Sequence, residues 1–225
     1  MATPLPQILS NLHAAAEAAG RPDPRLLAVS KTQPAEAVAA LAAQGQHAFG
    51  ENYVQEALAK MQALQYLDLE WHLIGHLQSN KAEAVASHFD WVQSVDRPKL
   101  VAALARHRPA GRAPLNVLIQ VNIDDESSKH GCAPQDVDAL AEAIGAEPTL
   151  CLRGLMAIPA PWPEAERRRD AFVRMRTLFD SLAARHPQVD TLSMGMSSDY
   201  AEAIAEGATL VRIGTALFGA RPRPA

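Results

Sequence analysis

Short apolar segments alternate with amphipathic segments along almost the whole chain. Apolar runs of strand length predict eight β-strands, at residues 26–30, 48–52, 71–76, 91–95, 116–123, 150–158, 191–196 and 210–217. Apolar residues at helical spacing, bounded by glycine or proline, predict helices over residues 34–43, 53–64, 80–87, 134–144, 164–185 and 199–206, and one that begins at Pro98. One more amphipathic helix, over residues 1–20, precedes the first strand.

This alternation predicts an α/β fold with a parallel sheet, because a helix between two parallel strands makes a right-handed crossover. Eight such units over roughly 200 residues fit a closed (β/α)8 barrel of the TIM type. An open doubly wound sheet is the alternative, since the same alternation would produce it. No internal boundary is visible, so residues 1–225 are expected to form one domain, with residues 220–225 as a flexible tail.

Composition and charge exclude several classes of protein. The chain has 225 residues and a formal net charge of −4, and it has no basic cluster of the kind that binds nucleic acid or anionic membranes. No stretch approaches the ~20 apolar residues that cross a bilayer, and the N-terminus does not resemble a signal peptide. The two cysteines, Cys132 and Cys151, have no metal-type spacing. We therefore expect a cytoplasmic protein without nucleic-acid or membrane partners.

Lys31 is the first candidate for chemistry, because it follows the first predicted strand. The functional residues of a parallel barrel lie where strands end. Of the five lysines, Lys60 and Lys99 are expected on solvated helix faces, whereas Lys31 ends a buried strand. Burial would favour an uncharged amine that can attack a carbonyl. An ion pair with Glu51 is an equally good interpretation at this point.

The last two strands indicate a phosphate site. If Val211 and its apolar neighbours face the outer helices, Arg212 points into the barrel, where a guanidinium needs an acceptor. Gly214 and Thr215 offer backbone N–H groups, and Ser197 and Ser198 precede a helix whose N-terminus favours a dianion. Plain N-capping is the alternative role for the two serines. Taken together, these residues favour a phosphate.

An amine opposite a phosphate site, with an inward arginine, describes a site for pyridoxal 5′-phosphate (PLP). The lysine would bind the cofactor as an aldimine, and the arginine would meet the pyridine nitrogen. Since a guanidinium only donates hydrogen bonds, it would leave that nitrogen unprotonated. The ring would then be a weaker electron sink than one paired with an aspartate.

Five segments, in order along most of the chain, carry recognisable motifs. They are AVSKTQP (28–34), FGENYVQE (49–56), WHLIGHLQSNK (71–81), SMGMSSDYAEAI (193–204) and VRIGTALFG (211–219). With these motifs the chain resembles the pyridoxal phosphate homeostasis protein family. That family, also known as the proline synthetase co-transcribed family, is related to the N-terminal domain of alanine racemase.

The resemblance implies a barrel with PLP on Lys31 and with Arg212 at the pyridine nitrogen. It assigns four further residues to the cofactor: Ser197, Gly214 and Thr215 at the phosphate, and Asn52 on the pocket wall. The segment SSKHGC (127–132) resembles the family's SKxG loop. Lys129 in that loop would be an accessory lysine that accepts or passes on the cofactor.

The resemblance also implies a protein that holds PLP and buffers it or delivers it to apo-enzymes, rather than an enzyme. Alanine racemase has a second domain that supplies a tyrosine opposite the lysine, whereas Tyr53 and Tyr200 are expected to pack at helix starts. Without an opposed group, stereoinversion lacks its second proton transfer. A small PLP-dependent racemase remains one alternative, and a Schiff-base aldolase acting on a phosphorylated sugar is another. Since no second domain is present, a monomer is expected.

His72 and His76 form an H-x-x-x-H pair that could suggest a metal. On a strand, four residues span ~13 Å, which is too far for one ion, so the sequence predicts no metal site. His72 is expected to face the pocket or the core, and it is kept with Lys129 as an accessory candidate.

Overall fold

Eight parallel strands close into a barrel in the computed structural model, which describes residues 3–126, 129–160 and 162–219. Each strand pairs with the next one along the chain, and β8 pairs with β1, so that Leu27 lies opposite Arg212. The strands are β1 (Arg25–Val29), β2 (Ala48–Glu51), β3 (Glu70–Leu73), β4 (Trp91–Val95), β5 (Leu115–Gln120), β6 (Leu150–Met156), β7 (Thr191–Met196) and β8 (Leu210–Ile213).

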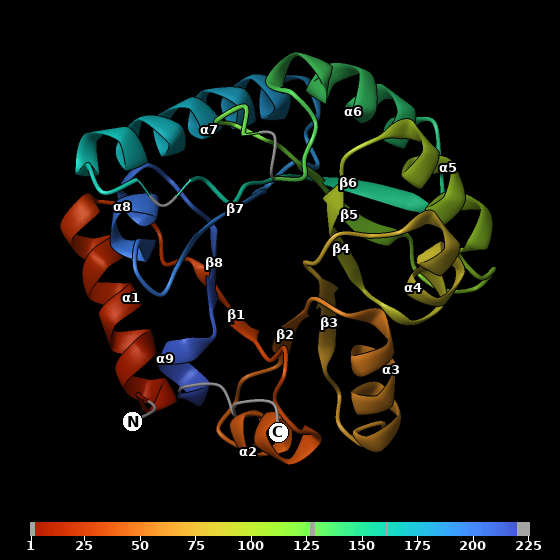
Figure 1. Ribbon diagram of the computed structural model, residues 1–225, viewed down its shortest axis with the longest axis horizontal. Coiled ribbons are helices and arrows are strands. Elements are labelled where there is room, and N and C mark those ends of the chain that lie inside the picture. Colours follow the sequence, from red (N-terminus) through yellow and green to blue (C-terminus); the bar gives the residue numbers. More distant parts are fainter. Residues whose placement is uncertain (1–2, 127–128, 161, 220–225) are drawn as a thin grey trace.

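Helices surround the barrel on its outside (Figure 1). The first helix packs against the last two, α8 and α9, and so covers the place where the barrel closes. The helices are α1 (Leu5–Ala19), α2 (Ala35–Ala42), α3 (Val54–Ala63), α4 (Ala82–His88), α5 (Pro98–His107), α6 (Val137–Gly145), α7 (Ala165–Arg185), α8 (Tyr200–Ala205) and α9 (Thr215–Phe218), with short 3-10 helices at Ser79–Lys81 and Pro134–Asp136.

The main hydrophobic core lies between the strands and the helices. Strands β4 and β8 are buried along their whole length, as expected for parallel strands that are covered on both faces. The long helix α7 contributes Phe172, Met175 and Phe179 to this core. Inside the barrel, buried polar side chains such as His72 and Gln93 take the place of some apolar ones.

The predicted closed barrel is confirmed, because the β1–β8 pairing excludes an open sheet. The N-terminal helix is confirmed as α1. The prediction of a last strand over 210–217 is wrong: β8 ends at Ile213, and residues Thr215–Phe218 form α9. A short apolar run fits a strand and a buried helical turn equally well, which explains the error. The tail predicted at 220–225 lies outside the described residues.

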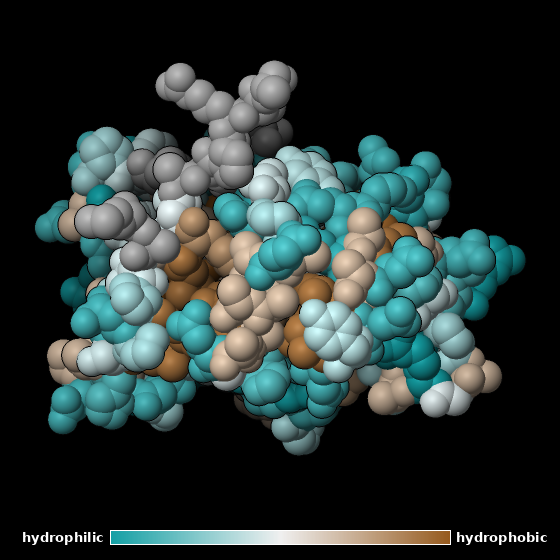
Figure 2. Space-filling model, turned by 90° about the horizontal axis from the view of Figure 1, so that it is seen from below, coloured by the Kyte–Doolittle hydropathy of each residue, from teal (hydrophilic) through white to brown (hydrophobic). Residues whose placement is uncertain are grey.

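The surface mixes polar and apolar residues. On the face shown in Figure 2, hydrophilic residues surround smaller hydrophobic areas. Within the described residues, no helix combines the length and the apolar character needed to span a membrane.

Candidate functional site

A pocket of about 380 Å³ opens at the carboxyl ends of β1, β7 and β8. This volume falls within the usual range for small-molecule sites. Apolar walls from Val29, Ile74 and Ile158 enclose it. The structure brings six of the predicted cofactor residues together on its lining: Lys31, Asn52, Ser197, Arg212, Gly214 and Thr215.

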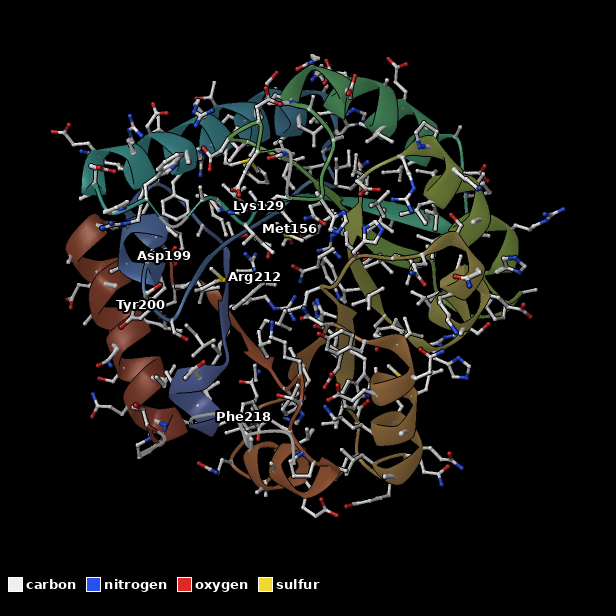
Figure 3. All side chains as sticks on the ribbon, in the orientation of Figure 1. Lys129, Met156, Asp199, Tyr200, Arg212 and Phe218 are labelled. Carbon is white, nitrogen blue, oxygen red and sulfur yellow. The ribbon has the colours of Figure 1, made fainter. Side chains whose placement is uncertain are left out.

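Arg212 lies inside the barrel on β8, and its side chain points away from the outer helices (Figure 3). Its Nη1 donates to Ser193 Oγ at 2.7 Å, and its Nη2 donates to the Ala157 carbonyl oxygen at 2.8 Å. Burial lowers the pKa of Arg212 to about 10, and the charge of Asp199 partly offsets this effect. The guanidinium therefore stays charged at neutral pH and is fixed by two neutral acceptors.

Lys31 sits in a tight turn directly after β1. The Gln33 N–H donates to the Ser30 carbonyl oxygen at 3.0 Å and closes the turn. Thr32 has a φ of 63°, a conformation that is costly for a β-branched residue. Its N–H donates to Glu56 Oε1 at 2.6 Å, which helps to hold this conformation. The turn is thus fixed from outside, and Lys31 faces the pocket from a rigid base.

A buried ion pair lies beneath this turn. Lys60 Nζ donates to Glu51 Oε1 at 2.7 Å, to Glu56 Oε1 at 2.6 Å and to the Ser30 carbonyl oxygen at 2.7 Å. Ser30 Oγ also donates to Glu51 Oε1, at 2.6 Å. The prediction of a solvated Lys60 is therefore wrong, because its side chain is only 6% exposed. Glu51, considered above as a partner of Lys31, forms its ion pair with Lys60.

The opposite wall of the pocket contains small residues. Ser197 and Ser198 are exposed to the pocket, and neither caps α8, whose N-cap position is held by Asp199. Asp199 Oδ1 instead accepts from the Met196 N–H at 2.6 Å. A Cβ at Gly214 would lie 3.1 Å from the Val29 carbonyl oxygen, a tight contact, so glycine favours the close approach of this segment to β1.

Asn52 contributes an unpaired polar atom to the pocket. Its Oδ1 is buried and finds no hydrogen-bond partner among the described residues. A Cβ at Gly75 would lie 2.1 Å from the Asn52 carbonyl oxygen, so this glycine allows the Asn52 backbone to take its place. A buried polar atom without a partner is costly, and a polar ligand in the pocket would satisfy it.

Taken together, the lining fits PLP. It provides an amine, a fixed cation, small residues that allow close approach, and an unpaired amide oxygen. Lys31 would hold the aldehyde carbon, Arg212 would face the ring nitrogen, and Ser197, Gly214 and Thr215 would receive the phosphate.

The accessory candidates do not line the pocket. His72 is fully buried inside the barrel, where it contacts Glu70 and Gln93 and stacks on Trp91, so of its two expected places it occupies the core. Lys129 lies near the rim, with its Nζ 3.3 Å from the Ile158 carbonyl oxygen.

The two tyrosines that could oppose Lys31 are also outside the pocket lining. Tyr53 is 59% exposed at the N-cap of α3, and Tyr200 begins α8 (Figure 3).

Sequence reasoning missed Lys60, Glu56 and Gly75, although one signal for Lys60 was readable. Val54, Ala57 and Lys60 are three residues apart and therefore lie on one face of α3. That face is buried.

Comparison with known proteins places this site in context. Residues 4–222 match the family model described as "Alanine racemase, N-terminal domain". The pyridoxal phosphate homeostasis protein of Pseudomonas aeruginosa is 56% identical over 218 residues, which are 96% of this chain and 93% of that protein. The structure of PipY from Synechococcus elongatus with PLP bound is 40% identical, with a TM-score of 0.80, and the match covers 94% of this chain and all of PipY. Alanine racemase from Corynebacterium glutamicum, at 20% identity and a TM-score of 0.67, shares the fold over 64% of its own length.

Proposed function

Because this chain belongs to the pyridoxal phosphate homeostasis proteins, within the family of the alanine racemase N-terminal domain, we propose that it binds PLP in the pocket at the ends of β1, β7 and β8. One observation carries the proposal: Lys31, Arg212 and the wall of Ser197, Gly214 and Thr215 line one pocket of suitable size. PipY, the relative solved with PLP bound, supports it. When bound, PLP supplies an aldehyde that reacts reversibly with amines.

Different residues of this chain would contact different parts of the cofactor. The turn fixed by Glu56 and Lys60 keeps Lys31 in place, and Asn52 offers its unpaired oxygen to a donor. Arg212 would face the ring nitrogen as a donor, since a guanidinium neither accepts a hydrogen bond nor gives up its proton at neutral pH. The site is thus suited to holding the cofactor and weak as an electron sink.

The same features argue for a carrier that buffers PLP or delivers it to apo-enzymes. A racemase needs a second proton-transfer group opposite the lysine. Tyr53 and Tyr200, the candidates for that role, are absent from the pocket lining. The curated relatives are likewise named for PLP homeostasis and not for a reaction. The recipient apo-enzymes, the monomeric state and the cytoplasmic location remain predictions.

The direct test uses purified protein incubated with PLP. We expect a visible absorbance band that borohydride reduction removes, with the added mass mapped to Lys31. Lys31→Ala should lose the band, whereas Lys99→Ala, the matched control at an exposed position on α5 outside the pocket, should keep it. Labelling spread over other lysines, or an unchanged band in Lys31→Ala, would overturn the proposal.

A second experiment separates the carrier from the enzyme and from the aldolase. The loaded protein is incubated with a panel of D- and L-amino acids, and we expect no turnover; measurable racemisation would replace the carrier function with the racemase alternative. Mixed with an apo-enzyme, the loaded protein should restore activity faster than PLP dissociates into buffer. Equal rates would reduce the function to passive buffering. A protein that does not bind PLP at all would favour the remaining alternative, a Schiff-base aldolase that acts on a phosphorylated sugar.

A further inference from the structure

Two histidines and an aspartate meet at the carboxyl ends of neighbouring strands, outside the pocket lining. His76 follows β3, Asp96 follows β4 and His130 follows β5. One ligand atom from each residue lies within 4.8 Å of the other two. The rings of His76 and His130 stack with centroids 3.7 Å apart, and His76 Nδ1 is 3.9 Å from an Asp96 carboxylate oxygen. Three separate loops thus bring three metal-ligand side chains to one point.

The ring nitrogens in this cluster are available for a ligand. Within residues 3–126, 129–160 and 162–219, neither ring makes a hydrogen bond, and the 3.9 Å contact to Asp96 is too long to be one. Stacking satisfies the faces of the rings but not their nitrogens. Both histidines are exposed and Asp96 is half-buried, so an ion and water can reach them.

Neighbouring side chains hold the three residues in place. Arg97 donates from Nη1 to Asp96 at 2.5 Å and from Nη2 to the Leu77 carbonyl oxygen at 2.9 Å, which ties the loop after β4 to the loop of His76. Gln120 Nε2 donates to the His130 carbonyl oxygen at 3.1 Å. Hydrogen bonds to ligating carboxylates and to the supporting backbone are typical of metal sites, where they orient the ligands.

We propose that His76, Asp96 and His130 form a binding site for a divalent first-row transition metal, with Zn²⁺ as the ion that fits best. Two imidazole nitrogens and one carboxylate oxygen are donors that suit Zn²⁺. In a tetrahedral site the donors lie about 3.3 Å apart, so the ligand atoms need to approach one another by at most roughly 1.5 Å through side-chain rotation. Three protein ligands leave one position for water or for an external ligand.

Charges around the cluster both oppose and favour a cation. Arg97 is positive, but its charge is opposed by Asp96, with which it forms an ion pair. The carboxylate of Asp96, 3.9 Å from His76 Nδ1, supplies the negative charge that favours a cation there.

This site differs from the sequence-based expectation of no metal. That expectation weighed only His72 with His76, and these two residues do have separate environments, since His72 is fully buried inside the barrel. The ligands of the proposed site follow three different strands, so their spacing in the sequence gives no metal signature.

Zinc binding is tested by calorimetric titration of the full chain, without a histidine tag and after removal of metals by a chelator. We expect one Zn²⁺ per chain. His76→Ala and His130→Ala should each weaken binding by at least about 10- to 100-fold, which is the loss typical of removing even a second-shell partner. Asp96→Asn should weaken it in the same direction. Absence of a stoichiometric site in the wild type, or unchanged affinity in the histidine variants, would overturn the proposal.

A matched control is present on α1. His13 forms an exposed pair with Asp23 at 3.0 Å, and no third ligand joins them in the described part of the chain. His13→Ala should therefore bind Zn²⁺ as tightly as the wild type. Equal losses in His13→Ala and His76→Ala would indicate non-specific surface binding. Far-UV circular dichroism checks that the exposed-histidine variants fold.

Two further measurements identify the ligands and separate this site from the PLP pocket. X-ray absorption of the Zn²⁺ complex should show two imidazole nitrogens and oxygen, and a sulfur ligand would contradict the assignment. Lys31→Ala should keep its Zn²⁺ affinity, because Lys31 is not part of the cluster. A loss of Zn²⁺ binding in Lys31→Ala would assign the metal to the pocket and overturn the separate site.

Discussion

The buried pair of Lys60 and Glu51 supports the turn that carries Lys31. Removing two charges from water is costly, and their attraction repays this only with good geometry and further hydrogen bonds. Here burial raises the pKa of Glu51, although hydrogen bonds from Lys60 and Ser30 act to lower it. Glu51 Oε2 has no partner among the described residues. The pair thus defines the position of the turn more than it stabilises the fold.

Replacing one member of this pair should be worse than replacing both. Lys60→Met leaves Glu51 uncompensated, and we expect the free energy of unfolding to fall by about 3–5 kcal/mol. The double variant Lys60→Met/Glu51→Gln should recover a large part of that loss. Urea unfolding of the wild type and the two variants measures both effects. A double variant less stable than Lys60→Met would contradict this account.

At the residue scale, the sequence predicts the site residues that lie on strands or at strand ends. It misses residues whose role depends on how separate elements pack together. Lys31 and Arg212 were predicted because a strand end and strand alternation determine where they point. The contact of Lys60 with Ser30 depends on how α3 packs under β1 and β2, which spacing along the chain does not specify. Gly75 was missed for the same reason, since its constraint comes from the Asn52 backbone.

A chain of hydrogen bonds crosses the barrel interior and links four strands. His72 on β3 contacts Gln93 Nε2 on β4 at 2.9 Å, and Ser193 Oγ on β7 donates to Gln93 Oε1 at 2.7 Å. Arg212 on β8 then donates to Ser193 Oγ at 2.7 Å. The orientation of Arg212 in the pocket therefore depends on elements on the far side of the barrel. Buried polar networks of this kind are sensitive to the loss of any one member.

Gln93→Leu should break this chain at its centre. His72 and Ser193 would each lose a buried partner, and since each unsatisfied group costs about 1–3 kcal/mol, we expect a loss of about 2–6 kcal/mol in unfolding free energy. PLP affinity should also fall, because Ser193, the hydrogen-bond partner of Arg212, would lose the Gln93 contact that orients it. Urea unfolding and PLP titration measure the two effects. Gln44→Leu, at an exposed position after α2, is the matched control and should change stability by less than about 0.5 kcal/mol. A Gln93→Leu protein as stable as that control would refute the network's role.

Among the elements, the barrel strands and the helices that connect them could be predicted, and the four-residue helix α9 could not. Predicted helix 164–185 is α7 almost to the residue, because 21 residues give a clear period. Thr215–Phe218 is only four residues long, and no periodicity distinguishes it from a strand. The hydrogen-bond network inside the barrel could not be predicted from the sequence either, because it joins residues from strands that are far apart in the chain.

Across the whole molecule, the two ends of the barrel have different roles. The pocket and the proposed metal site lie at the carboxyl ends of the strands, whereas ion pairs close the opposite end. There Arg153 and Arg25 lie 5.0 and 5.8 Å from the Trp91 ring centre, and Arg25 pairs with Glu70 at 2.6 Å. In barrels of this type, residues at the amino-terminal ends of the strands generally serve stability, and residues at the carboxyl ends serve function. The count of eight strands favoured a closed barrel over an open sheet, and the pairing of β1 with β8 decides between them.

The pairing of Arg153 with Asp190 at that end makes stability depend on pH. Burial alone would raise the pKa of Asp190, but hydrogen bonds from Arg153 and Thr191 outweigh it and hold that pKa below its usual value of 3.8. A carboxylate with a lowered pKa in the folded state stabilises the fold above about pH 4 and loses this contribution as the pH falls through the folded-state value. Because the pair is partly exposed, we expect Asp190→Asn to cost about 1 kcal/mol at pH 7.

The test is to compare wild type and Asp190→Asn by urea unfolding at pH 7 and at pH 3. At pH 3 the unfolded chain is already largely protonated at this position, so part of the wild-type advantage is lost and the difference between the two proteins should shrink. Asp68→Asn, at an exposed residue, should show no such change. A difference that grows on acidification would mean that Asp190 is stabilised in its protonated form, which contradicts an ion pair as the link between β6 and β7.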